Sequence, residues 1–209
     1  MQFSRVLALS ALTTLGVAAY ATPFTYVGLD SNRSMGVTIT YDGKNYNVGA
    51  GVAMLKLGSD PLTGLCVDLD HWNSNGATYN VNVRPITDLG ANATRASWLV
   101  ENYLATATSK EKGAALQLAV WDIIYDNGDG FGAGRVKSSI SGNTRDIANN
   151  YITLSNAKSS ANAYWFQATS HGHDGKSNQN FMSPVPEPGS MVALGLGALA
   201  LLRRRRRNG

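Results

Sequence analysis

The chain has 209 residues, enough for one domain with a hydrophobic core, and its 18 lysines and arginines exceed its 14 aspartates and glutamates. The excess lies at the two ends, because residues 1–21 hold one arginine and residues 184–209 hold five arginines and one glutamate. Residues 22–183 are left with 12 basic and 13 acidic side chains, a net charge of −1. This charge excludes a nucleic-acid partner for the central segment.

The N-terminal residues have the pattern of a signal peptide. Arg5 precedes an apolar stretch at residues 6–18, and Ala19 and Ala21 flank Tyr20 as small residues do at a cleavage site. We expect export by the Sec system and cleavage after Ala21. An uncleaved anchor helix is the alternative, but the apolar stretch is short for a membrane span.

The first half of the central segment has the pattern of β-strands. Asp42-Gly43-Lys44 predicts a hairpin turn, and a loop at residues 73–76 separates two later strands. The predicted strands lie at residues 24–29, 35–41, 46–57, 64–69 and 79–85.

The hydrophobic spacing then changes to that of helices. A first helix is expected from a cap at residues 92–94 to Leu104. Ser109 caps a second, which runs from Lys110 to about Tyr125. The remaining predicted elements are a helix at 144–157 and strands at 164–168 and 181–182. The fold class is therefore α+β, a mainly antiparallel β-sheet or barrel with a helical insertion of two to three helices.

The second predicted helix contains one polar residue that needs an explanation. Between Gly113 and Tyr125 only Gln117 and Asp122 are polar, so this helix is hydrophobic nearly all round and should be buried. A buried carboxamide without a partner costs about 1–3 kcal/mol. We therefore expect Gln117 to have a partner, and a hydrogen bond to a neighbouring loop is the simplest one.

The single cysteine, Cys66, is the second residue that needs an explanation. Strand alternation over residues 64–69 places Cys66 on the same face as Asp68, so we expect the thiol to be exposed beside carboxylates. In an oxidising compartment a lone exposed thiol is easily oxidised unless it is capped or reactive. A small, buried structural cysteine is the alternative interpretation.

Two short motifs resemble a known family. Leu65-Cys66-Val67-Asp68 and Leu116-Gln117-Leu118-Ala119-Val120-Trp121 are similar to the paired motifs of bacterial thioester domains, known from surface adhesins of Gram-positive bacteria. The resemblance covers residues 66–125. It implies that the Cys66 thiol and the Gln117 carboxamide form an internal thioester with loss of ammonia.

The resemblance also implies the chemistry that follows. An amine on a target attacks the Gln117 acyl carbon, so the protein itself is consumed in one acyl transfer and is not an enzyme. His71 is a candidate base for the incoming amine. The candidate shields of the site against water are Trp72, Trp121 and Tyr125.

Two further segments have weak metal-site patterns. Residues 126–130 share some features of a calcium loop, but Lys137 occupies the position of the bidentate glutamate, so we interpret the segment as a turn. Residues 171–174, His-Gly-His-Asp, are interpreted as an ordinary polar loop. We expect no metal and no cofactor.

The C-terminal residues combine three features in a fixed order. Pro186, Glu187 and Pro188 cannot continue a helix and stay extended, and an apolar run at 191–202 follows them. The basic residues that set the membrane topology are Arg203, Arg204, Arg205, Arg206 and Arg207. The arrangement resembles the PEP-CTERM sorting signal of Gram-negative bacteria. It implies processing by an exosortase after transient anchorage of the C-terminal helix in the inner membrane. An anchor that is never cut is the alternative.

The predicted organisation is a signal peptide at 1–21, an extracellular thioester-like domain at 22–183 and a sorting tail at 184–209. We expect a surface or matrix protein that attaches covalently to amine groups of a surface or biofilm component. A non-covalent exopolysaccharide-binding module with a structural cysteine is the alternative, and a cysteine hydrolase is a third. The tryptophans available for sugar binding are Trp72, Trp98 and Trp165.

Overall fold

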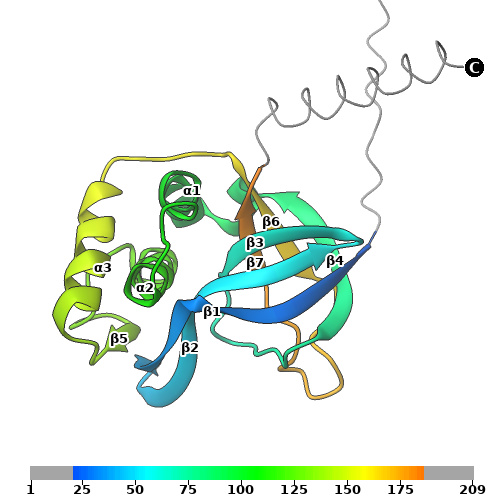
Figure 1. Cartoon of the computed structure of the whole chain (residues 1–209), viewed down its shortest axis with the longest axis horizontal. Coiled ribbons are helices and arrows are strands. Elements are labelled where there is room, and N and C mark those ends of the chain that lie inside the picture. Colours follow the sequence, from blue (N-terminus) through cyan, green and yellow to red (C-terminus); the bar gives the residue numbers. More distant parts are fainter. Residues whose placement is uncertain (1–20, 186–209) are drawn as a thin grey trace, which may run out of the picture.

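A computed structural model describes residues 21–185 of the chain. The predicted signal helix and the predicted C-terminal helix lie outside the described residues. Within them the chain forms strands and helices in the order shown in Figure 1. The elements are β1 (Thr22–Tyr41), β2 (Lys44–Leu57), β3 (Asp60–Cys66), β4 (Ala77–Pro85), the 3₁₀ helix η1 (Ile86–Leu89), α1 (Ala91–Tyr103), α2 (Lys110–Asp126), β5 (Val136–Ser138), α3 (Gly142–Leu154), β6 (Ala163–Ala168) and β7 (Phe181–Pro184).

The strands close into a barrel. The sheet order is β2-β3-β7-β6-β4-β1-β5, and β1 also pairs with β2, so all strands except β5 form a closed ring. Every ladder between these strands is antiparallel. The prediction of an α+β fold with a mainly antiparallel sheet or barrel is therefore confirmed for the part of the chain described.

The long strand β1 makes the closure possible. Its register with β2 shifts between Tyr26 and Gly28 and again between Leu29 and Ser34, and bulges of this kind bend a strand. Residues 22–26 pair with β4, and residues 24–26 pair with β2 as well, whereas the far end of β1 pairs with β5. The hairpin to β2 turns at Asp42 and Gly43, which have φ angles of 47° and 78°, as a tight hairpin requires.

Helix α2 is the centre of the helical layer. It packs against α1 and α3 on one side and against β1 and β2 on the other, and Figure 1 shows the three helices together on one side of the barrel. The Ser109 hydroxyl accepts a hydrogen bond from the Lys112 amide, and the helix ends at Asn127 with a left-handed φ of 58°. A Cβ at Gly113 would collide with the Arg33 carbonyl, so glycine is what allows α2 to approach β1 this closely.

Several predicted boundaries are wrong in instructive ways. The stretches 24–29 and 35–41 are one continuous strand, because the two bulges let β1 bend without ending. The strand predicted at 64–69 starts earlier and ends at Cys66. It ends there because the Asp68 carboxylate accepts hydrogen bonds from the amides of Asp70 and His71, which turns the chain.

Candidate functional site around Cys66 and Gln117

Cys66 and Gln117 lie together at the end of β3, beyond the last residue that pairs with β2. The β2–β3 ladder stops at the pair Ala53–Gly64, whereas Leu65 and Cys66 still pair with β7. The backbone N–H and C=O of Cys66 therefore need partners that β2 does not supply.

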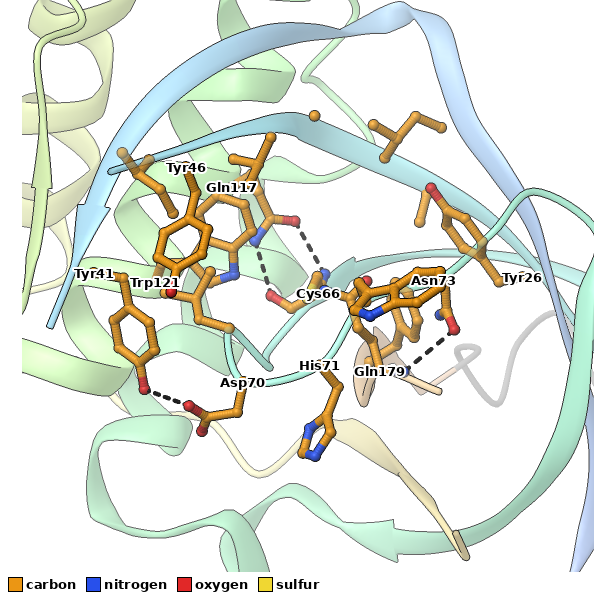
Figure 2. Close-up of a pocket in the computed structure, with 18 of the residues that line it drawn as sticks. Tyr26, Tyr41, Tyr46, Cys66, Asp70, His71, Asn73, Gln117, Trp121 and Gln179 are labelled. Carbon is orange, nitrogen blue, oxygen red and sulfur yellow. Dashed lines mark hydrogen bonds between the residues drawn. The ribbon is translucent and has the colours of Figure 1, made fainter. Parts of the chain in front are cut away.

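The Gln117 side chain supplies both partners. The Cys66 N–H donates to Oε1 of Gln117 at 3.0 Å, and Nε2 of Gln117 donates to the Cys66 carbonyl at 2.8 Å (Figure 2). Gln117 is 1% exposed, and its carboxamide occupies the place of a peptide group in a neighbouring strand. The carboxamide carbon is thus held against the residue that carries the thiol.

The Cys66 thiol is buried, and the expectation of an exposed thiol is wrong. Cys66 is 8% exposed, because Gln117 of α2 lies against it, so both faces of β3 are covered at its end. Its Sγ donates to the Asp68 carbonyl at 3.0 Å, and the Asp68 amide N–H lies 3.3 Å from the sulfur. Burial, together with the Asp68 charge, raises the pKa of the thiol to about 12, against the lowering effects of the Asp68 amide and the Trp121 indole.

Trp121 brings an unpartnered donor to the same place. It lies one turn after Gln117 on α2, and Figure 2 shows its indole nitrogen on the side of the ring that faces Cys66 and Gln117. Although the indole lowers the pKa of the thiol, its buried N–H makes no hydrogen bond to any described residue within the usual limits of distance and angle. A buried donor of this kind costs about 1–3 kcal/mol, so it favours any acceptor that forms beside it.

The pair lies in a cavity that reaches the surface. The cavity has a volume of about 520 Å³, and Cys66, Gln117 and Trp121 line it together. Among the other lining residues, two large aromatic side chains are exposed, Trp72 at 50% and Tyr46 at 43%, so they mark the opening. A small molecule or a flexible side chain can therefore approach Cys66 and Gln117 through this mouth.

The predicted helper residues have different positions. Trp72 lines the mouth and Trp121 lies beside the pair, as the role of a shield requires. Tyr125 does not line the cavity: its hydroxyl accepts a hydrogen bond from the Leu69 amide at 2.9 Å, so it supports the loop behind the site. The imidazole of His71 points away from Cys66 in Figure 2, which does not support its role as a base.

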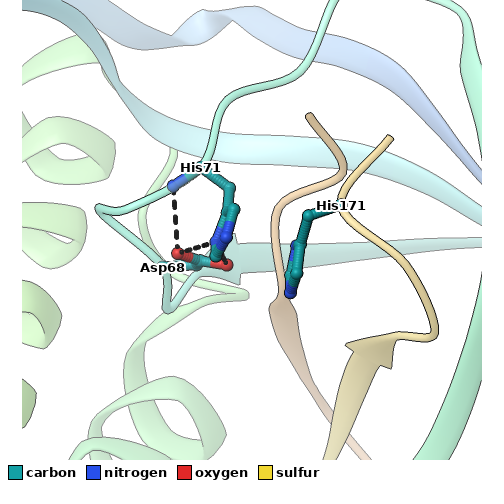
Figure 3. A group of neighbouring side chains, drawn as sticks. All are labelled: Asp68, His71 and His171. Atoms are coloured by element: carbon teal, nitrogen blue, oxygen red, sulfur yellow. Dashed lines mark hydrogen bonds and ion pairs between the residues drawn. The ribbon is translucent and has the colours of Figure 1, made fainter. Parts of the chain in front are cut away.

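The His71 imidazole is used elsewhere. Its Nδ1 lies 2.8 and 2.9 Å from the two oxygens of Asp68, and its ring stacks on His171 with 3.5 Å between ring centroids (Figure 3). The buried Asp68 carboxylate also accepts hydrogen bonds from the backbone and the side chain of Asn180. Sequence reasoning missed this role of Asp68, which ties the loop after β3 to the loop before β7.

The Asp68–His71–His171 cluster has metal-ligand residue types, with ligand atoms within 4.8 Å of one another. The two rings are only 10° from parallel, however, and imidazole lone pairs lie in the ring plane, so stacked rings cannot both point at one ion. The Asp68 oxygens are also filled by the donors described above. The interactions of Asp68, His71 and Asn180 instead connect the loop after β3 with the loop before β7.

Comparison with known proteins identifies the tail. Residues 184–207 match the family model described as the PEP-CTERM protein-sorting motif. The chain carries a PEP-CTERM sorting signal. Such a signal implies a protein that is exported, transiently membrane-anchored, processed by an exosortase and finally located at the cell surface. No curated protein and no solved structure matches the chain.

The PEP-CTERM signal gives the burial of Cys66 a context. Disulfides and oxidised thiols accumulate outside the cytoplasm, where a PEP-CTERM protein functions, and a buried thiol is protected from that oxidation. In residues 21–185 we find no helix with the length and apolar character needed to cross a membrane.

Proposed function

We propose that Cys66 and Gln117 form an internal thioester through which this exported protein attaches covalently to amine groups of a surface or biofilm component. The observation that supports this most strongly is the double hydrogen bond between the Gln117 carboxamide and the Cys66 backbone, within a cavity that opens to solvent. In the same proposal the Sec system exports the chain, and the tail anchors it in the inner membrane until an exosortase acts.

Thioester formation needs attack of the Cys66 sulfur on the Gln117 carboxamide carbon. The C–S bond forms, the C–N bond breaks, and the thiol proton leaves with the amide nitrogen as ammonia. The Cys66 N–H, 3.0 Å from Oε1, can stabilise the negative charge that develops on that oxygen, in the manner of an oxyanion hole. Because the groups are held together by the fold, the reaction is intramolecular.

Acyl transfer then follows when a target amine enters the cavity. Its nitrogen bonds to the Gln117 acyl carbon, the C–S bond breaks, and the proton of the amine passes to the Cys66 sulfur. The Asp68 amide and the Trp121 indole, which lower the pKa of the thiol, can stabilise the departing thiolate. Burial then favours the protonated thiol, a poor nucleophile, so the new amide persists. Each molecule reacts once and is a reagent, not an enzyme.

The two alternative functions, hydrolysis and glycan binding, differ in how well the site supports them. A cysteine hydrolase needs a histidine that can act as a base beside the thiol, whereas the imidazole of His71 is bound to Asp68. Non-covalent glycan binding remains a second candidate, because Trp72 and Tyr46 expose aromatic faces at the cavity mouth. Trp165 is buried, so the expectation that it is a surface residue is wrong.

The experiment that tests the proposal is the intact mass of the purified protein before and after methylamine treatment. We expect a mass about 17 Da below the sequence value, for one ammonia lost, and a gain of about 31 Da with the amine. Cys66→Ala and Gln117→Ala should both abolish the deficit. Gln167→Ala is the matched control, because Gln167 lies on β6 and does not line this cavity. A wild-type mass equal to the sequence value and unchanged by amine would rule the thioester out.

A further inference from the structure

A second cluster of chemically active side chains lies at the other end of α2. Asp122 and Asp126 are one turn apart near its C-terminus, and Asp129 lies in the following loop. Each offers a carboxylate oxygen within 4.8 Å of the other two. Two oxygens bound to one Ca²⁺ at about 2.4 Å lie at most about 4.8 Å apart, so the three can share one ion. None of them lines the cavity around Cys66 and Gln117.

The buried member of this cluster has an oxygen without a partner. Asp122 is fully buried, at 0% exposure, and its Oδ2 accepts a hydrogen bond from the Gly130 amide at 3.2 Å. Its Oδ1 has no hydrogen-bond partner among the described residues. Buried carboxylate oxygens in folded proteins nearly always have a partner, so this one points to a group that the chain does not supply.

The charges around Asp122 also favour a cation. Burial, with the charges of Asp129 and Asp126, raises its pKa to about 6, against the lowering effects of the Gly130 hydrogen bond and the Arg95 charge. No lysine or arginine within residues 21–185 forms an ion pair with any of the three carboxylates. The Arg95 guanidinium donates instead to the carbonyls of Asn127 and Ile152 and to the side chains of Ser155 and Asn156.

The backbone at the end of α2 adds partial negative charge beside the three carboxylates. The C-terminus of a helix carries a partial negative charge, and three carboxylates beside it repel one another and the helix end. The loop that holds Asp129 is nonetheless well formed, because the Asp126 carboxylate accepts hydrogen bonds from the amides of Arg135 and Val136 at 2.9 and 2.6 Å. The fold thus holds three carboxylates together, and no ion pair within residues 21–185 involves any of them.

We propose that Asp122, Asp126 and Asp129 bind one Ca²⁺ ion at the C-terminal end of α2. Three carboxylates are hard oxygen ligands, which suit Ca²⁺ better than the nitrogen- and sulfur-seeking transition metals. Lys137 in place of a loop glutamate does not bear on this site, because the buried ligand is Asp122, which precedes the loop on the helix. Extracellular calcium modules bind at about 10⁻⁴–10⁻³ M, an affinity that an exported protein can use.

The ion has a structural consequence for the reactive pair. Asp122 follows Gln117 by five residues on the same helix, and the ion ties the end of that helix to the loop that leads into β5. Calcium binding should therefore raise the melting temperature and lower the mobility of the helix that presents Gln117. This site is independent of thioester formation.

The test is calorimetric titration of the chelator-treated purified protein with CaCl₂, together with the melting temperature at each concentration. We expect one ion per chain and a melting temperature that rises with Ca²⁺. Asp129→Asn, at an exposed position, should fold and weaken binding about tenfold or more, because affinity depends on the number of charged ligands. Asp122→Asn should do the same, and Asp146→Asn, an exposed aspartate on α3, should leave binding unchanged.

Two outcomes would overturn the calcium site. One is the absence of saturable binding up to the millimolar range in the wild-type protein, with no change in melting temperature. The other is binding that Asp129→Asn and Asp122→Asn leave unaltered, since the ion would then be held elsewhere. Intact mass measured on the same samples reports the thioester separately, so the failure of either idea is recognised without affecting the other.

Discussion

Helix α2 carries two buried polar side chains, Gln117 and Asp122, which differ in how fully they are hydrogen-bonded. Gln117 is neutral, and both ends of its carboxamide are hydrogen-bonded to the backbone of Cys66. Asp122 is acidic, and one of its oxygens has no partner among the described residues. A fully bonded buried group indicates a partner within the chain, whereas a half-bonded one indicates a partner from outside. The two proposals follow this difference, with internal chemistry at Gln117 and a ligand at Asp122.

The largest effect is expected from removing the bonded member of the pair. In a Cys66→Ala background, which cannot form a thioester, Gln117→Ala leaves the backbone groups of residue 66 without partners and opens a cavity. The free energy of unfolding, measured by urea denaturation, should fall by about 3–4 kcal/mol. Gln167→Ala, at a half-buried glutamine that accepts a hydrogen bond from Arg84, should cost less than about 1 kcal/mol. Equal losses of unfolding free energy in the two variants would show that the interactions of Gln117 contribute no more to stability than those of Gln167.

A substitution at Trp121 tests whether its unpartnered indole N–H takes part in the proposed thioester chemistry. Trp121→Phe keeps most of the ring and removes the buried N–H, so stability should change by less than about 1 kcal/mol. Reaction of the thioester with methylamine, followed by mass, should slow about tenfold, because removing a donor that stabilises developing charge slows reactions at least that much. An unchanged rate would assign the indole a packing role only.

Asp122 should make stability depend on pH in a particular direction. Its pKa is raised from 3.8 to about 6 in the folded protein, mainly by burial, so the folded state binds this proton more tightly than the unfolded chain. The stability contributed by the proton is complete below the unfolded pKa and is lost as pH rises through the folded one. With chelator present, Asp122→Asn should therefore gain in melting temperature over the wild type between pH 4 and pH 7. With calcium at pH 7 the wild type should instead have a higher melting temperature than Asp122→Asn.

The smallest effect on stability is expected at the cavity mouth. Trp72 is half exposed, so Trp72→Ala should change the free energy of unfolding by no more than about 0.5 kcal/mol and leave the thioester intact. It should slow reaction with an amine-bearing polysaccharide such as chitosan more than reaction with methylamine, because only the larger target contacts the mouth. Equal slowing with both amines would contradict a role in target recognition.

The sequence predicted the local features of this fold well. The Ser109 cap and the Asp42-Gly43 turn are set by short-range chemistry and occur as expected. The hydrophobic character of α2 also predicted its burial, because a helix that is apolar all round must be covered on every side. These features need no knowledge of distant parts of the chain.

Features that depend on distant pairing were not predictable. The exposure of Cys66 was judged wrongly because alternation was taken to mean one buried and one exposed face, and nothing local shows that Gln117 of α2 lies against Cys66. The position of His71 depends on Asp68 and on His171, which is a hundred residues further along the chain. The three-residue strand β5 exists only because β1 offers it an edge.

The path of mechanical load follows from the pairing of β7. This four-residue strand leads directly into the sorting signal at residues 184–207, and its Phe181 pairs with Cys66 on β3. Under the proposed function a target is bonded to Gln117 of α2, whose carboxamide lies against the backbone of Cys66. Force from the target would then enter the protein close to β7, the strand from which the C-terminal tail leaves.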